Sequence, residues 1–468
     1  MEWVVLKTDL LFFLLLVGMV IYAWSVSVES HLATTWKQVA TRPLGMAAAS
    51  VFSFFLLVAF LDSLHFEYSV LESDTGTHGK RGEVLSALDI FVTPIRVNSE
   101  KTYSAPFAFR SYAKEAIEMP DGSIVRDYPR LLFGGAHLQN PTEDRLGDIL
   151  TKSCRGALLG LFFSLVICIG TLWIFSLRGN RGLKDTYRLL ITGPYARSLY
   201  SVGIAILVMF CTVSVLASLA PYYHVFGTDK VGGDVLYQGI KSIRTGLLIG
   251  TLTTLVMLPF AIFFGVSAGY FGGWVDDAIQ YVYTTLASIP GVLLIAASAL
   301  ILDSYMTRHA ADFANLSARA DVRLIALCMI LGVTSWTGLC RYLRGEVLKL
   351  RELDYITAAQ AFGVRNYLIL LRHILPNIMH IVMISIVLDF SGLVLAEAAL
   401  TYINIGVDPT MESWGNMINS ARLELAREPV VWWSLTAAFV FMFLLVLAAN
   451  IFADTVRDAF DPRIRKML

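Results

Sequence analysis

Charged residues are scarce in this chain of 468 residues. They make up 16% of the sequence, against about 25% in an average soluble domain, while 56% of the residues are hydrophobic and the mean hydropathy is +0.63. This composition excludes a soluble enzyme and predicts a membrane protein. The 37 basic and 37 acidic residues cancel, so no net field attracts nucleic acid, and none is expected as a partner.

Cysteine and the motifs of common active sites are also few or missing. The cysteines show no C-x-x-C spacing, which excludes a disulfide framework or a cysteine zinc site. We expect small apolar packing residues at Cys154, Cys168, Cys211, Cys328 and Cys340. There is no G-x-x-x-x-G-K-[ST], hence no P-loop, and no H-E-x-x-H or G-x-S-x-G. We therefore expect no catalytic residue, no metal site and no cofactor bound by this chain.

Long uncharged runs are what the sequence has in abundance. A bilayer core about 30 Å thick needs about 20 helical residues, and nine runs come near that length. The predicted crossings are Leu10–Val28, Leu44–Leu61, Gly156–Leu177, Ser198–Ala220, Thr245–Phe271, Ala278–Leu302, Leu324–Cys340, Ile374–Ile403 and Pro429–Ala453. The first is interpreted as a helix rather than a cleaved signal peptide, because no small-x-small site follows it. The sequence thus predicts an all-α polytopic membrane protein.

Basic residues in the short loops orient these helices. Five basic residues stand against one acid in Arg178–Arg197, and six stand against three in Arg341–Arg372, so both loops are expected in the cytoplasm. Asp303–Asp321 and Asp408–Glu428 lack a basic excess and are expected outside. The turn Gly272–Asp277 is an exception, because it carries two acids and no base. Nine crossings then place the N-terminus outside the membrane and the C-terminus in the cytoplasm.

One long polar stretch, residues 62–152, interrupts the helices and is predicted to be an extracytoplasmic insertion of mixed structure. Turns are expected at Asp74-Thr-Gly and Pro120-Asp-Gly. The chain is therefore divided into N-terminal helices (1–61), the insertion (62–152), a transmembrane hairpin (153–221) and a C-terminal helical region (222–468).

The cytoplasmic segment 345–377 has the pattern of two short helices separated by a break. Val347–Ala361 is rich in helix formers, Gly363 can end a helix in the left-handed conformation, and Asn366 can begin another as its N-cap. Pro376 then bends the chain into the membrane. The side chains expected to form an exposed ridge for a soluble partner are Tyr355, Ala358, Ala359 and Phe362.

An amphipathic helix in the membrane interface would show the same local pattern, but this segment also resembles the EAA loop of ATP-binding-cassette importer permeases. The matching residues are Ala358, Ala359, Gly363, Leu375 and Pro376. The resemblance implies that an ATPase subunit is contacted through Asp354, Tyr355, Ala358, Ala359, Phe362, Gly363, Arg372 and Pro376. The chain departs from the motif at Thr357, where Glu is most frequent, and at His373, where many families have Ile.

Further stretches narrow the resemblance to one branch. Phe226–Leu236 resembles the external Gly-Thr-Asp-x-x-Gly-Arg-Asp-Val segment of the second permease of dipeptide, oligopeptide and nickel importers, with Gly233 in place of Arg as in the Yej-type branch. Ala268–Asp276, Ser413–Met417 and Arg457–Arg463 fit the same family, so the resemblance covers about residues 222–463. It implies external gating or binding-protein docking by Thr228, Asp229, Gly232, Gly233, Asp234 and Trp414. The same residue types also serve as ordinary turns and helix caps.

Two acids, Asp389 and Glu397, lie inside the eighth predicted crossing and about 80° apart around its helix. An ionisable residue in the membrane core normally faces a water-filled path or a partner. They are candidates for a translocation path that meets a peptide amine or a metal cation, or for buried acids bonded to a neighbouring helix. Trp432 and Trp433 are expected to anchor the last crossing at the external interface.

The resemblance implies a type I importer permease core that moves di- or oligopeptides across the bacterial cytoplasmic (inner) membrane. The partners it implies are a second homologous permease, two ABC ATPase subunits or domains that bind ATP and Mg²⁺, an extracytoplasmic substrate-binding protein and the lipid bilayer. Three alternatives stay open: an importer of nickel or another small solute, a non-transporting scaffold or sensor that uses the insertion, and an ion-driven transporter that uses the two acids.

The N-terminal part of the chain fits the family in two ways. In one, residues 10–177 are an extension and Ser198–Ala220 is the family's first helix. In the other, Leu44–Leu61 is that helix, residues 62–152 enlarge its external loop, and residues 156–220 are an inserted hairpin. The second is favoured, because Arg42-Pro-Leu resembles the family's entry into its first helix.

Overall fold

The chain is built mainly of helices. The computed structural model describes residues 2–28, 30–69, 82–118, 124–179, 182, 184–185, 188, 192–309 and 316–460. In that part of the chain, nine helices are long and apolar enough to cross a membrane. These spans are Lys7–Ser25, Pro43–Asp62, Pro141–Leu177, Ala196–Leu219, Val235–Phe271, Gly291–Arg308, Ala318–Arg351, Asn366–Tyr402 and Trp433–Phe460. The predicted all-α polytopic fold is confirmed.

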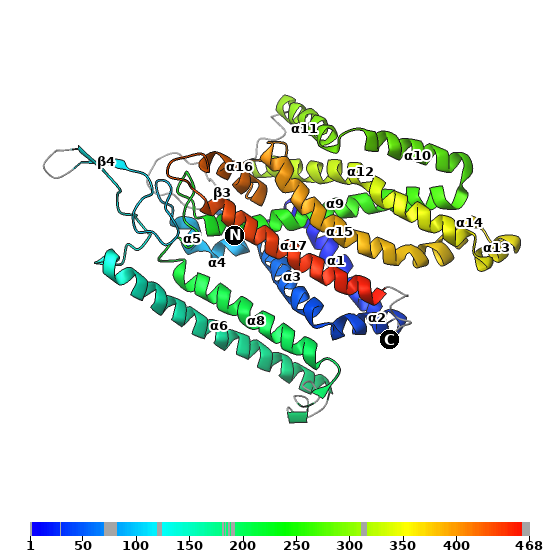
Figure 1. Cartoon of the computed structure of the whole chain (residues 1–468), viewed down its shortest axis with the longest axis horizontal. Helices are drawn as coiled ribbons and strands as arrows, with labels where there is room; N and C mark the ends of the chain where they lie inside the picture. Colours follow the sequence, from blue (N-terminus) through cyan, green and yellow to red (C-terminus); the bar gives the residue numbers. More distant parts are fainter. Residues whose placement is uncertain are drawn as a thin grey trace. The chain divides into compact units, whose positions relative to one another are not determined.

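Figure 1 shows the order of the elements along the chain. The helices are α1 (Lys7–Val28), α2 (Ser30–Thr41), α3 (Pro43–Asp62), α4 (Ala87–Phe91), α5 (Thr93–Val97), α6 (Pro141–Gly179), α8 (Ala196–Leu219), α9 (Val235–Phe271), α10 (Gly273–Ser288), α11 (Gly291–Arg308), α12 (Leu316–Arg351), α13 (Asp354–Ala361), α14 (Asn366–Ile369), the π-helical turn η1 (Leu370–Ile374), α15 (Leu375–Tyr402), α16 (Trp414–Glu424) and α17 (Trp433–Phe460). The strands are β1 (Glu2–Val4), β2 (His65–Ser69), β3 (Gly82–Ser86), β4 (Glu115–Glu118) and β5 (Ile124–Asp127).

Two compact units share these elements. The first unit contains residues 1–5, 37–245 and 412–452, and the second contains residues 6–36, 246–411 and 453–468. Each unit therefore draws on stretches that are far apart in the sequence. The four consecutive segments predicted from the sequence stay a prediction, since the units do not follow those boundaries.

The bounds of the sixth predicted crossing, Ala278–Leu302, are wrong. The structure has two helices there, α10 and α11, and only Gly291–Arg308 is among the candidate spans of the described residues. Pro290 has no amide hydrogen and disfavours a helical conformation in the residue before it. Ile289 accordingly adopts an extended conformation, with φ −84° and ψ 129°. Several other helices extend past the predicted crossings, because charged residues end an uncharged run without ending a helix.

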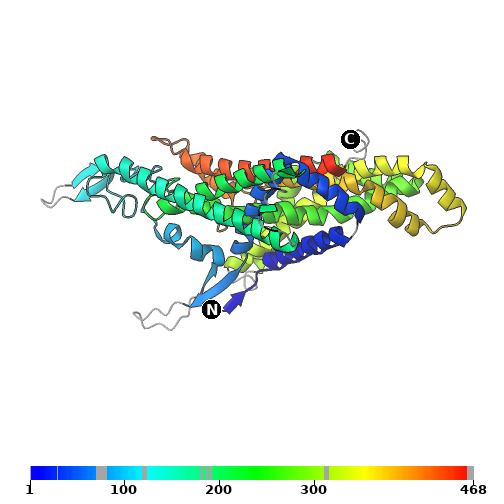
Figure 2. The same cartoon turned by 90° about the horizontal axis from the view of Figure 1, so that it is seen from below.

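The insertion has the mixed structure that was expected. Strands β1, β2 and β3 form an antiparallel sheet in which Trp3 pairs with Phe66 and Phe66 pairs with Leu85. Figure 2 shows its edge strand β1, in dark blue, next to the N-terminus. Strands β4 and β5 form a separate antiparallel pair. The predicted turns at Asp74 and Pro120, part of the basic loop 178–197 and the end of the Arg457–Arg463 motif lie outside the described residues.

Helices α6 and α8 form the predicted hairpin of the first unit and lie side by side in Figure 1. Gly156 and Gly160 are four residues apart on α6 and allow this close approach: a Cβ atom at Gly160 would lie only 2.5 Å from Cys211 Cα on α8. Small residues at this spacing are a common contact between membrane helices. Among the cysteines, Cys328 and Cys340 are buried as expected, Cys154 is exposed, and all five are free thiols.

Candidate functional sites

The EAA-like segment of the second unit forms a helix, a tight turn and a second helix, as predicted. Leu353 is extended and precedes α13, and Gly363 ends α13 with φ +73°. The Gly363 N–H donates to Gln360 O (2.9 Å) and the Val364 N–H donates to Ala359 O (3.1 Å). This pair of hydrogen bonds is the Schellman arrangement that terminates helices at a left-handed residue.

The two faces of this segment differ sharply in burial. Ile356, Ile369 and Ile374 are fully buried and pack into the apolar core of the second unit. Phe362 is 88% exposed, and it belongs to an exposed ridge that we define as Tyr355, Ala358, Phe362, Val364, Tyr367 and Leu371. Ala359 was predicted to lie on this ridge, but it is half-buried and packs against the same core. Asp354 is exposed in the first turn of α13, where a carboxylate is favoured by the helix dipole.

Tyr270, near the end of α9, ties the segment to the rest of the second unit. Its hydroxyl donates to Asn366 Oδ1 (3.0 Å) and accepts from Gln360 Nε2 (3.4 Å), while its carbonyl accepts from Arg351 Nη1 (3.3 Å). Tyr270 itself is buried. Both short helices, α13 and α14, are therefore bonded to one side chain.

Arg344 on α12 makes a second link, to Asp276 at the start of α10. Its Nε and Nη2 donate to the two carboxylate oxygens at 2.5 Å and 2.6 Å. A bidentate pair of this kind fixes geometry as well as charge, and the guanidinium lowers the pKa of Asp276, although burial opposes this. The acidic turn Gly272–Asp277, an exception to the charge pattern, thus has its compensating base on another helix.

The entry into α15 differs from the prediction. Asn366 is the first residue of α14, and Arg365 is the N-cap. A π-helical turn, which includes exposed Arg372, follows and leads into α15, where exposed Pro376 occupies the first turn. Proline is tolerated there because it lacks only a hydrogen bond that the first turn does not make. Pro376 therefore does not interrupt the span Asn366–Tyr402.

The outer segment 226–234 belongs to the first unit and forms a tight loop that enters α9. Asp229 Oδ1 accepts hydrogen bonds from the Val231 and Gly233 N–H groups (3.0 and 2.8 Å), and Asp229 Oδ2 accepts from Gln238 Nε2 (2.8 Å). Gly232 has φ +79°, and its carbonyl accepts from the Glu100 N–H at 2.9 Å. The loop is thus fastened both to itself and to the insertion.

Three buried ionisable side chains hold this loop against the insertion. His224 Nδ1 lies 2.7 Å from Asp234 Oδ2, and its Nε2 lies 3.4 Å from Glu100 Oε1. Burial would lower the pKa of His224, but its bond to Asp234 and the Glu100 carboxylate raise it to about 9. Burial would raise the pKa of Glu100, but His224 and three backbone N–H groups of residues 132–134 lower it to about 2. His224 and Glu100 are therefore both charged across the neutral pH range.

Thr228 and two tryptophans complete the outer site. Thr228 is fully buried and bonds to Thr102 O (2.8 Å) through its hydroxyl and to Ser104 through its backbone, while Trp433 Nε1 donates to Thr228 O (2.9 Å). Trp414 is 1% exposed and donates to Gly239 O (3.1 Å). Trp433 is also buried and therefore does not act as the predicted interfacial anchor, whereas Trp432 is exposed.

The residues predicted for gating or docking therefore fall into two groups. Thr228, Gly232, Asp234 and Trp414 are buried and shape the loop, while Asp229 and Gly233 are half-buried and lie beside exposed Lys230 and Val231. Glu412 lies near this loop, and its pKa is raised to about 7 by burial and by the Asp229 carboxylate, against the effect of Lys241. Contact with a partner stays a prediction for this site.

The two membrane acids have different surroundings on α15. Glu397 is 1% exposed and accepts a hydrogen bond from the Thr401 hydroxyl at 2.9 Å, so it is a buried, bonded acid. Asp389 is half-buried. In the described part of the chain, no three His, Cys, Asp or Glu side chains form a group that could hold a metal ion.

Sequence reasoning missed Tyr270, Arg344, Glu100 and His224, and it assigned Trp433 a different role. Tyr270 lies inside the Ala268–Asp276 motif and could have been singled out from it. The other residues form their contacts with residues that are distant in the sequence or that show no recognisable motif, so the sequence gives no indication of these contacts.

Comparison with known proteins finds similarity to permease proteins of transport systems. Residues 261–466 match the family model described as the binding-protein-dependent transport system inner membrane component. The chain is 29% identical over 240 residues to the dipeptide transport system permease protein DppC of Lactococcus lactis, covering 51% of this chain and 64% of that protein. It is 31% identical over 244 residues to the glutathione transport system permease protein GsiD of Pectobacterium atrosepticum (52% and 73%), and 29% identical over 279 residues to the oligopeptide transport system permease protein OppC of Mycobacterium tuberculosis (56% and 89%).

Proposed function

Because the chain belongs to the family of binding-protein-dependent transport permeases, we propose that it is one permease subunit of an ATP-driven importer of peptides. The observation that carries this proposal is the exposed ridge on α13 and α14. Six apolar or aromatic side chains face outward there, while the opposite face is anchored by fully buried isoleucines. A rigid, exposed apolar ridge is the form of a surface that docks into a groove of another protein.

The partner at this ridge is an ATPase subunit or domain, which binds ATP and Mg²⁺ and performs the hydrolysis. When two such subunits close, they push on α13 and α14. The push is transmitted to α9 through Tyr270 and to α10 through Arg344 and Asp276, because these contacts join the short helices and α12 to the membrane helices of the second unit. The work of this chain is mechanical, and no chemistry on the substrate is assigned to it.

The remaining assembly follows from the same proposal. The chain pairs with a second homologous permease, and an extracytoplasmic binding protein delivers cargo at the loop 226–234. The basic segment 341–372 lies in the cytoplasm, which sets the N-terminus outside and the C-terminus inside the bacterial inner membrane.

Peptides are proposed as the cargo because the relatives named above are permeases for dipeptides, oligopeptides and glutathione. Asp389, half-buried in a membrane span, is the candidate group in this chain to meet a peptide amine on the path. Glu397 is buried and hydrogen-bonded to Thr401, so we assign it a structural role next to the path and no contact with the cargo.

The test is co-purification of the complex by a tag at Leu468 from its native membrane. Phe362→Ala removes an 88% exposed side chain that makes little contribution to the fold of this chain. If Phe362 fills a groove of the ATPase, its loss costs about 2 kcal/mol, or about thirtyfold in affinity. We expect the variant to reach the membrane normally and to lose the ATPase.

The matched control is Phe263→Ala, on α9, where the side chain is 67% exposed within a membrane span. It should retain both the ATPase and uptake of a labelled tripeptide into cells. Recovery of the wild-type chain without any ATPase, or with signalling proteins instead, would contradict the importer proposal. Retained ATPase with uptake of nickel and not of the peptide would contradict the cargo alone.

A further inference from the structure

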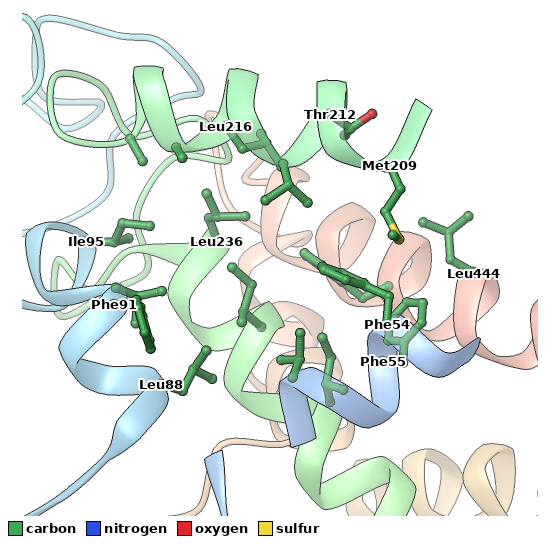
Figure 3. A pocket seen from close by; sticks show the side chains of 18 of the residues that line it. Phe54, Phe55, Leu88, Phe91, Ile95, Met209, Thr212, Leu216, Leu236 and Leu444 are labelled. Atoms are coloured by element: carbon green, nitrogen blue, oxygen red, sulfur yellow. The ribbon is translucent and has the colours of Figure 1, made fainter. Parts of the chain in front are cut away.

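A large apolar cavity lies within the first unit, away from the sites described above. Its volume is about 640 Å³, and it is lined by α3, α4, α5, α8, α9 and α17. Figure 3 shows Met209 and Leu216 pointing from α8 toward Phe54 and Leu236 on the opposite walls, with Phe91 at one end. The volume falls within the range of about 300–1,000 Å³ that is typical of small-molecule sites.

The lining has almost no hydrogen-bonding capacity. Thr212 contributes the single side-chain hydroxyl among the described lining residues, and it already donates to Val208 O at 2.8 Å within its own helix. A peptide in this cavity would leave its N–H and C=O groups without partners, which is costly in an apolar environment. Water is disfavoured for the same reason, since apolar cavities of this kind stay dry and take up apolar molecules.

The position of the cavity identifies the apolar molecules within reach. Four of its walls are membrane spans, and its lining includes Val208 and Phe91, which are also 59% and 74% exposed at the surface. The cavity therefore opens at the surface of the first unit, beside Val208 of the membrane span α8. On α3 the lining residues are Val51–Val58, in the half nearer to the insertion, and on α9 they lie in the first turns.

A helix of a partner protein does not fit. A helix about 10 Å across that crosses a core about 30 Å thick occupies roughly 2,400 Å³, which is more than the cavity can hold. An acyl chain is thin, apolar along its length and present at high concentration on the open side.

We propose that this cavity binds one acyl chain of a membrane phospholipid from the leaflet on the side of the insertion. The chain lies along Phe54, Met209 and Leu216, while its headgroup stays outside, beside α4 and α5. The lipid then fills the space between the α6–α8 hairpin and the spans α3, α9 and α17, and supports the hairpin as part of the folded unit. This proposal does not depend on the transported cargo.

The first test uses the wild-type complex in vesicles of phosphatidylethanolamine and phosphatidylglycerol that contain phosphatidylethanolamine with a diazirine in mid-chain. After illumination and exhaustive detergent washing, mass spectrometry maps the labelled peptides. We expect labels on the inward face of α8 at Met209 and Leu216 and on Phe91, together with one phospholipid that survives washing. Labels confined to the outer surface of α6, or cross-links from the cavity walls to another protein chain, would overturn the proposal.

The second test fills the cavity. Ala205 lines it and is half-buried, whereas the adjacent Ile204 does not line it and is 62% exposed. Ala205→Phe should lose the retained phospholipid and the label on α8, and Ile204→Phe should keep both. Equal retention by the two variants would overturn the proposal, and the wild-type labelling map decides the question if Ala205→Phe does not assemble.

Discussion

Two glycines in the left-handed conformation play different roles at the two functional sites. Gly363 ends α13 with φ +73°, and a Cβ atom there would meet nothing within 4 Å. Gly232 has φ +79°, and a Cβ atom there would overlap the backbone carbonyl of Glu100 in the insertion. Gly363 is required only for its left-handed backbone conformation. Gly232 is required for the same conformation and also because a side chain would collide with Glu100.

The two alanine variants should therefore differ in cost. Gly363→Ala should lose only about 1–2 kcal/mol of folding stability, because alanine disfavours the left-handed conformation. This variant should still assemble with its partners. Gly232→Ala must also push the loop away from Glu100 and break its hydrogen bond to the Gly232 carbonyl, so we expect more than about 3 kcal/mol. Thermal unfolding of the purified variants measures the difference. Similar midpoints would mean that the loop 226–234 is not pressed against the insertion.

His224 makes the stability of the outer site depend on pH. Its pKa in the fold is about 9, raised from an ordinary 6.5 because the Asp234 and Glu100 carboxylates outweigh the effect of burial. The protonated form is therefore favoured by folding, and its contribution is complete below pH about 6.5 and is lost as the pH rises through about 9. The loss should be on the order of 2–3 kcal/mol.

The pH dependence is measured by thermal unfolding between pH 6 and 10, with His224→Gln as the comparison. The variant should be less stable at pH 6 and should lose much of the alkaline decline seen in the wild type. On the acid side, Glu100 predicts a decline as the pH falls from 4.5 toward 2, because its pKa is lowered. An alkaline decline of the same size in His224→Gln would show that another group titrates.

At the scale of elements, Tyr270 bonds both α13 and α14 to the membrane helix α9. Tyr270→Phe retains the buried ring and removes the hydroxyl that bonds Asn366 and Gln360. We expect a complex that assembles and hydrolyses ATP but transports several-fold less peptide per ATP. Reconstituted vesicles measure the two rates together. Tyr281→Phe, on α10 and 74% exposed, is the control and should behave as the wild type. An unchanged ratio of peptide transported to ATP hydrolysed in Tyr270→Phe would show that Tyr270 does not transmit motion between the ATPase and the membrane helices.

The sequence predicted elements best where the signal is local. The break before Asn366 was predicted because Gly363 follows a run of helix formers, and the structure has it at that residue. The bounds Ala278–Leu302 were wrong because an uncharged run shows only the absence of charge and does not register the helix break at Pro290. The burial of Ala359, and the bond of Asn366 to Tyr270, depend on which face of a short helix meets the core, which spacing alone does not determine.

At the scale of the whole molecule, the sequence indicated an insertion between membrane helices but not the contacts that hold it in place. Its anchors join residues that are far apart in the chain, as Glu100 does with His224 and Asp89 with Lys241. Such pairs carry no periodic or spacing signal, so they appear only in the structure. They bring the insertion and the start of α9 into one compact unit together with α3. Helix α8 belongs to the same unit, so the grouping fits either assignment of the family's first helix, and the assignment to α3 stays a prediction.

A substitution of Lys241 tests whether the insertion and the membrane helices of the first unit fold together. Its ammonium contacts Asp62 at the end of α3 (2.7 Å) and Asp89 of α4 (2.9 Å), and all three side chains are largely buried. Burial would raise the pKa of Asp89, but Lys241 and the Ser86 N–H lower it, so this carboxyl is charged in the fold. Lys241→Met would leave two buried carboxylates without their cation, which typically costs about 3–5 kcal/mol.

We therefore expect Lys241→Met to accumulate poorly in the membrane and to unfold at a lower temperature. Lys230→Met, a change at an exposed lysine, should stay within about 0.5 kcal/mol of the wild type. Combining Lys241→Met with Asp62→Asn and Asp89→Asn should recover much of the loss, because the unpaired charges are then gone. A Lys241→Met protein as stable as Lys230→Met would mean that the insertion is a separable domain, and the permease helices would then have to fold without it.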